Sequence, residues 1–171
     1  MSLTKGLIIA ALVVWLQLST LPALRPFGVV PNLALVAVIL LAARLPLTSS
    51  LGLAVGVGWL LDLGSGSDYG LRTTFYLLAA LAVAMLRQFG SDLENLSLVA
   101  SIVVTATVLL NLAILANLAL LHVNLPLGYI AEKMAAEIAC NLVLLVIVRW
   151  IFNALAGRTT EMALHIGGRR G

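Results

Sequence analysis

Six apolar segments separated by short polar turns constrain this chain more than any other feature of its sequence. A helix of about 20 apolar residues crosses the roughly 30 Å hydrocarbon core of a bilayer, and only helices and closed barrels satisfy their backbone there. The composition agrees, because 62% of the residues are hydrophobic and 10% are charged, against about 45–50% and about 25% in soluble domains. The predicted helices cover residues 7–24, 32–45, 50–64, 71–88, 96–121 and 127–155.

The sequence therefore predicts an all-α, polytopic membrane protein with six transmembrane helices. Residues 1–156 would form the six-helix transmembrane domain, and the more polar residues 157–171 a mobile cytoplasmic tail. We interpret 7–24 as an uncleaved first helix, because its apolar run exceeds the roughly 7–15 residues of a signal-peptide core.

The placement of the basic residues predicts the orientation. Six helices put both termini on one side, and cytoplasmic loops carry an excess of Lys and Arg. With the N-terminus inside, seven of the 10 basic residues lie on the cytoplasmic side. We therefore expect both termini in the cytoplasm, and we do not interpret the net charge of +3 as nucleic-acid binding. The cytoplasmic set is Lys5, Arg44, Arg87, Arg149, Arg158, Arg169 and Arg170, and the outer set is Arg25, Arg72 and Lys133.

The stretch from residue 51 to 74 combines spaced glycines with one carboxylate. Gly52 and Gly56 are four residues apart, so they share one side of a helix and allow a close approach by another helix. Gly58 and Asp62 have the same spacing on a different side. A Gly/Ser-rich hinge follows, with glycines at positions 66 and 70. These positions are candidates for helix packing or partner binding.

Asp62 has two interpretations. As a buried ionisable group in a membrane helix it would mark function. One turn from the helix end, it could instead be hydrated at the outer interface and cap nothing. Arg72 could pair with Asp62 or Asp68 across the hinge, and exposed pairs of this kind contribute about 0–1 kcal/mol.

Glu137 is predicted roughly 15 Å into the last helix, near the middle of the hydrocarbon. Asn141 lies one turn further on the same face and Lys133 one turn back. One interpretation is a Lys133–Glu137 pair that snorkels outward, and the other is a polar core that binds a partner helix or a small solute. Asn111, with the other Asn, Ser and Thr residues of segment 96–121, indicates interhelical hydrogen bonds or a polar pathway.

No pattern in the sequence indicates catalysis. The single cysteine, Cys140, excludes an intramolecular disulfide and a Cys-cluster metal site. His165 has no Cys or acidic partner at metal-ligand spacing. There is no phosphate-binding glycine loop and no Gly-x-Ser-x-Gly motif. We therefore expect a protein that is not an enzyme, with no catalytic residues, no cofactor and no bound metal.

The central motif resembles that of the rod shape-determining MreD family, over roughly residues 31–88. The string at 31–33 is Pro-Asn-Leu where that family has Pro-Asp-Leu. The resemblance implies a non-catalytic scaffold of the bacterial cell-elongation and peptidoglycan-synthesis machinery in the cytoplasmic membrane. Its implied partners are an MreC-like single-pass protein, MreB, RodA, a penicillin-binding transpeptidase and membrane lipid. The matching residues are Gly52, Gly56, Asp62, Gly66, Gly70 and Leu71.

The MreD family also resembles, in fold, the substrate-binding S components of vitamin transporters, which supplies an alternative function. The chain would then be a small-molecule-binding membrane subunit that needs an energising partner. S components meet that partner through an Ala-xxx-Ala helix surface, and Ala80 and Ala84 have that spacing here. The low aromatic content of 6% argues against a stacking pocket for a vitamin ring.

Overall fold

The computed structural model describes residues 3–65, 70–120, 122 and 126–167, and every regular element in these ranges is a helix. Four helices are long and apolar enough to cross a membrane, at Thr4–Leu24, Leu47–Gly64, Leu96–Leu120 and Leu127–Ala154. The protein is therefore a helical membrane protein. The elements are α1 (Leu3–Ser19), α2 (Leu21–Leu24), the 3-10 helix η1 (Pro26–Gly28), α3 (Leu33–Ala42), α4 (Leu47–Ser65), α5 (Leu71–Gln88), α6 (Leu96–Leu120) and α7 (Leu127–Gly167).

The short helix α3 forms the centre of the bundle. It contacts α1, α4, α5, α6 and α7, and none of its side chains is more than 8% exposed. A helix that is apolar on all sides, as α3 is, belongs in such an interior. Its 10 residues span only about 15 Å at about 1.5 Å per residue. We expected a crossing helix over 32–45, but α3 ends before the turn at Pro46, since the residue before a proline disfavours helix.

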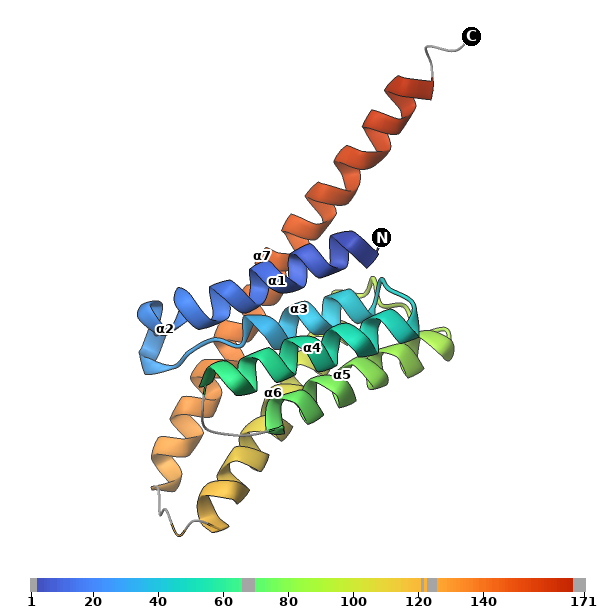
Figure 1. Ribbon diagram of the computed structural model, residues 1–171. Coiled ribbons are helices and arrows are strands. Elements are labelled where there is room, and N and C mark those ends of the chain that lie inside the picture. The colour runs from blue at the N-terminus through green and yellow to red at the C-terminus, as the bar shows by residue number, and fades with distance from the viewer. Residues whose placement is uncertain (1–2, 66–69, 121, 123–125, 168–171) are drawn as a thin grey trace.

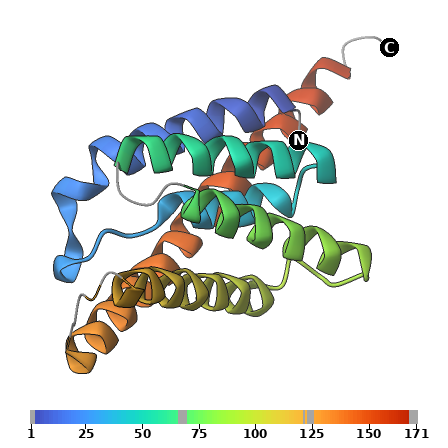
Figure 2. The same ribbon diagram turned by 60° about the horizontal axis from the view of Figure 1, so that its bottom comes forward.

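The longer helices run alongside α3 in alternating directions. Figure 1 shows α1, α3, α4 and α5 side by side. The helices α6 and α7 form a second pair, and α7 runs obliquely to the other helices. In the turned view of Figure 2, α6 lies beneath α5 and beside α7. The start of α1 and the end of α7 lie toward the same end of the bundle (Figure 1).

Most of the predicted helices are found with shifted ends. The helix α5 has the predicted bounds, and it is not among the four candidate spans. The predicted helix 7–24 is interrupted after Ser19, and the short helices α2 and η1 follow it. The last helix continues to Gly167, so 157–167 is helical rather than a segment outside the helix. The polar residues there include no proline that would end the helix.

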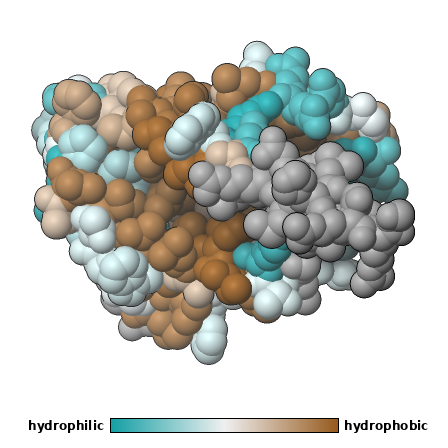
Figure 3. Space-filling model, turned by 90° about the horizontal axis from the view of Figure 1, so that it is seen from above, coloured by the Kyte–Doolittle hydropathy of each residue, from teal (hydrophilic) through white to brown (hydrophobic). Residues whose placement is uncertain are grey.

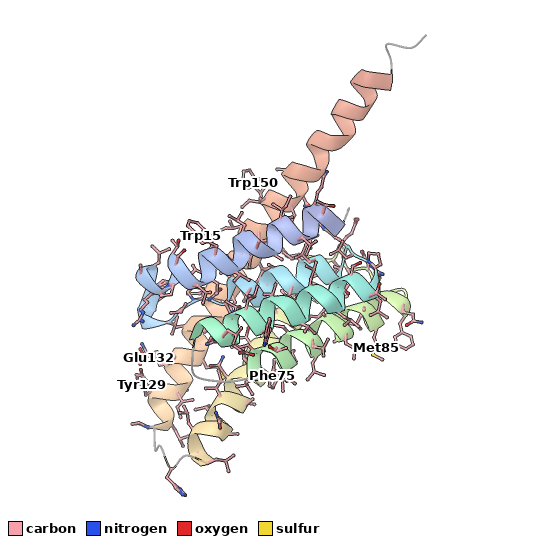
Figure 4. All side chains as sticks on the ribbon, in the orientation of Figure 1. Trp15, Phe75, Met85, Tyr129, Glu132 and Trp150 are labelled. Carbon is pink, nitrogen blue, oxygen red and sulfur yellow. The ribbon has the colours of Figure 1, made fainter. Side chains whose placement is uncertain are left out.

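The outer surface is apolar, as expected for a protein surrounded by lipid. Seen from above, apolar side chains occupy the middle of the face and the most hydrophilic ones lie toward its edges (Figure 3). Trp15 and Trp150 project outward from α1 and α7 (Figure 4), and they are 61% and 71% exposed. Tryptophan is enriched at membrane–water interfaces, so these side chains are suited to anchoring the bundle.

Candidate functional site

The first polar feature is the N-terminus of α3, which begins inside the bundle. Asn32 and the first residues of α3 are at most 8% exposed, so the free N–H groups at this end of the helix are buried and need acceptors. Asn32 caps the helix, since its Oδ1 accepts from the N–H of Leu35 at 3.0 Å. The side chain of Gln17 on α1 accepts from the N–H of Ala34 at 3.3 Å and donates to the carbonyl of Pro31 at 3.0 Å.

Asn32 also joins α3 directly to α5 and α7 and, through Asn141, to α6. Its N–H donates to Oδ1 of Asn141 on α7 at 2.7 Å, and its Oδ1 accepts from the hydroxyl of Tyr76 on α5 at 2.6 Å. The Nδ2 of Asn141 in turn donates to Oγ1 of Thr107 on α6 at 3.0 Å. Asn141 and Thr107 are fully buried. This chain of bonds, which we call the α3 cap cluster, is formed by Gln17, Asn32, Tyr76, Thr107 and Asn141.

Glu137 lies half-buried beside the α3 cap cluster. Its Oε2 accepts from Nδ2 of Asn111 on α6 at 3.0 Å, and the same Nδ2 lies 2.9 Å from the carbonyl of Thr107. The predicted Lys133–Glu137 pair is not the arrangement found, because Nζ of Lys133 donates to the carbonyl of Phe27 at 3.0 Å. Phe27 has a positive φ of 55°, so the loop carbonyl is turned toward α7. The Asn residues of α6 and α7 thus form the interhelical hydrogen bonds that were one of our two interpretations.

The second polar feature joins α4 to the start of α5. Asp62 is 2% exposed, and its Oδ2 accepts from the N–H of Gly70 at 3.1 Å, the N–H of Thr73 at 3.0 Å and the hydroxyl of Thr73 at 2.7 Å. Its Oδ1 accepts from the N–H of Arg72 at 3.3 Å. A carboxylate stabilises a helix N-terminus because it meets both the free N–H groups and the positive end of the helix dipole. The hydrated carboxylate that caps nothing is therefore the wrong interpretation of Asp62.

The local sequence explains why α5 is capped by a residue of another helix. Gly70, the residue before α5, has a left-handed φ of 86° and no side chain to act as a cap. The cap therefore comes from Asp62. The side chain of Arg72 donates from Nη1 to the carbonyl of Leu61 at 3.4 Å. Gly66 and Asp68, also singled out from the sequence, lie outside the described residues.

Gly58 brings the two helices close enough for this cap. A Cβ at Gly58 would overlap the Cα of Thr73 and lie 2.9 Å from its backbone nitrogen. Gly58 and Asp62 therefore act on the same residue of α5, one by leaving space and the other by accepting hydrogen bonds. We call Gly58, Asp62, Gly70 and Thr73 the α4–α5 lock.

Gly52 and Gly56 show the opposite arrangement. A Cβ at either position would meet nothing within 4 Å, and Gly52 is exposed on the outside of α4. No described helix of this chain uses the close approach that these glycines allow. Their predicted role in helix packing is therefore not found among the described residues.

The polar groups of the interior are engaged with one another. Within the described residues, every buried side-chain nitrogen or oxygen atom has a hydrogen-bond partner. The same residues contain no group of three His, Cys, Asp or Glu side chains that could hold a metal ion. Most of the interior polar residues therefore connect one helix to another.

Three members of these two features were not predicted from the sequence. Gln17, Thr73 and Tyr76 were treated as ordinary residues of their helices. The shortness of the apolar run after Pro31 was the available signal, because a half-length helix needs caps at membrane depth. Comparison of the chain with protein-family models, with curated proteins and with solved structures gives no match.

Proposed function

We propose that this protein is a non-catalytic scaffold of the bacterial cell-elongation machinery, which binds an MreC-like single-pass protein in the cytoplasmic membrane. In this proposal the bundle crosses the membrane six times and both termini are cytoplasmic. The short helix α3 would complete its crossing with the chain that precedes it. The observation that supports the proposal best is the open glycine pair on α4, because its small residues face away from every described helix.

The surface around this pair has a shape suited to a partner helix. Val55, Trp59 and Leu63 are 40%, 59% and 54% exposed on α4, and they follow Gly52 and Gly56 at helical spacing on one face. Small residues between larger ones allow another helix to approach closely. In lipid, helices associate by close packing at such small residues, since apolar surface alone gives no preference for protein over lipid.

The interior supports a scaffold more than a solute-binding subunit. A solute site needs polar groups aimed at the ligand, whereas the buried polar side chains of the described interior bond to one another. The Ala-xxx-Ala surface of the alternative would need to be accessible, but Ala80 is fully buried in the bundle.

Co-purification tests the proposal. The full chain should co-purify in mild detergent with the MreC-like protein of the same cell, and its depletion should give rounded cells. Gly52→Leu with Gly56→Leu should abolish co-purification while the protein still inserts, because Leu favours the bilayer. Gly128→Leu is the matched control, since a Cβ there also meets nothing within 4 Å, on α7.

Two results would contradict the proposal. One is normal rods on depletion together with purification of the chain alone with a tightly held vitamin-like solute, which would favour the transporter-subunit alternative. The other is an unchanged yield of the partner with the double Leu variant.

A further inference from the structure

Three arginines line one cleft at an end of the bundle. The cleft has a volume of about 340 Å³ and is lined by Arg44, Arg87 and Arg149, with apolar walls that include Leu40 and Leu93. Its volume is within the roughly 300–1,000 Å³ of small-ligand sites. The arginines come from the turn after α3, the last turn of α5 and the middle of α7. The fold thus gathers positive charge that is dispersed in the sequence.

Each guanidinium is held in place by one hydrogen bond to the chain. Arg87 donates from Nη1 to the carbonyl of Leu45 at 2.7 Å, and Arg149 donates from Nη2 to the carbonyl of Glu94. Arg44 donates from Nη2 to Oδ1 of Asn153 at 2.7 Å, and it lies 5.3 Å from the ring centre of Phe152. A guanidinium carries five N–H donors. Most of the donors around the cleft therefore remain for a ligand.

The two acids of the cleft offset only part of this charge, because three arginines against two carboxylates leave a formal charge of +1. Asp92 directs Oδ1 to the N–H of Glu94 at 2.9 Å, and Glu94 offers Arg149 its carbonyl rather than its carboxylate. Burial and the nearby charge of Arg149 lower the pKa of Arg44, and Glu94 opposes that shift. Arg44 and Arg149 are close enough to repel one another, so an anion between them would be stabilised.

We propose that this arginine cleft binds a phosphate group. Arginine forks match phosphate oxygens two at a time, and basic clefts between membrane helices bind anionic lipid head groups. The phosphate can come from such a lipid or from a soluble phosphate. Trp150, the residue after Arg149 on α7, points outward from the bundle (Figure 4). An interfacial tryptophan there is consistent with a head group as the source.

Native mass spectrometry of the full chain in detergent tests the proposal. The protein should retain phosphatidylglycerol in preference to phosphatidylcholine. Arg87→Gln with Arg149→Gln should reduce that retention about tenfold, since bonds between charged groups are among the stronger hydrogen bonds. Lys5→Gln with Arg25→Gln is the control, because it removes the same two positive charges from exposed sites outside the cleft. Inorganic phosphate, added without lipid, tests the soluble source.

The outcomes separate the two sources and the failure of the proposal. Selective loss of phosphatidylglycerol in the double Gln variant supports a lipid head group. Retention of inorganic phosphate alone, lost in the same variant, supports phosphate recognition from a soluble source. Wild-type protein that shows no preference for phosphatidylglycerol and no binding of phosphate overturns the proposal. An equal loss in Lys5→Gln with Arg25→Gln also overturns it, because the attraction would then depend on net charge and not on the cleft.

Discussion

The helix α4 carries two pairs of residues at the same four-residue spacing with opposite surroundings. Gly58 and Asp62 face α5, where the first leaves room for Thr73 and the second accepts hydrogen bonds from it. Gly52 and Gly56 have open space around them. Spacing therefore places two residues on one face of a helix, but the neighbours of that face decide whether they pack within the chain.

The difference follows from the short connection between α4 and α5. The last turn of α4 and the first turn of α5 meet at one end of the bundle, so a carboxylate there lies close to free N–H groups. The faces of α4 that point elsewhere have no such partner. Gly58 is therefore a glycine that the fold requires, whereas Gly52 and Gly56 remain accessible. Substitutions at these positions can test both assignments.

The largest effect is expected for Gly58→Ala. Its new Cβ would overlap backbone atoms of Thr73, which cannot move aside as a flexible side chain could. We expect a loss of about 1–3 kcal/mol in the free energy of unfolding, the usual cost of overpacking. Cys140 is buried and is the single cysteine, so a thiol-reactive dye can report thermal unfolding in detergent. Gly56→Ala is the control. Equal midpoint temperatures of unfolding for Gly58→Ala and Gly56→Ala would show that the two glycines have the same surroundings.

Asp62→Ala should have the next largest effect. It removes the acceptor for four donors at the start of α5, and loss of a helix N-cap costs about 0.5–2 kcal/mol. Asp62→Asn should be milder, because one amide oxygen can replace Oδ2, which accepts three of the four bonds. The same dye assay measures both, and equal losses for Ala and Asn would show that the charge rather than the oxygen matters.

A smaller effect is expected for Asn141→Leu in the α3 cap cluster. It removes the bonds to the N–H of Asn32 and to Thr107. Polar contacts between membrane helices average about 0.6 kcal/mol, with a maximum near 1.7, so we expect a loss of about 1 kcal/mol. Thr105→Leu, at an exposed site of α6, is the comparison. A larger loss for Thr105→Leu would contradict the assignment of the cluster.

The smallest difference is expected between Glu137→Leu and Glu132→Leu. Glu137 bonds to Asn111, whereas Glu132 points away from the bundle (Figure 4). The first variant should lose about 0.6 kcal/mol and the second nothing measurable. Equal midpoint temperatures of unfolding for the two variants would mean that the Asn111–Glu137 bond contributes no stability.

The all-helical membrane class was predictable, because long apolar segments admit few other folds. The bounds of α5 and the start of α6 follow from turn residues beside apolar runs. The helical continuation of α7 beyond residue 155 was not predicted, because the polar residues there were interpreted as the end of the helix. Asp62 and Gly58 were found from spacing, but their shared contact with Thr73 was not. That contact depends on the angle at which α4 and α5 cross. The spacing of residues along one helix does not determine that angle.

The position of α3 also bears on how the chain is assembled at the membrane. Its side chains touch protein on every side, so its stable position depends on partners that include α6 and α7, which are synthesised later. A ribosome-bound fragment that stops after α4 would hold a half-length helix whose first N–H groups lack the acceptor on α7. Integration of this segment should therefore be completed late, when the last helix leaves the translocation channel. The bundle would then become stable as one unit rather than helix by helix.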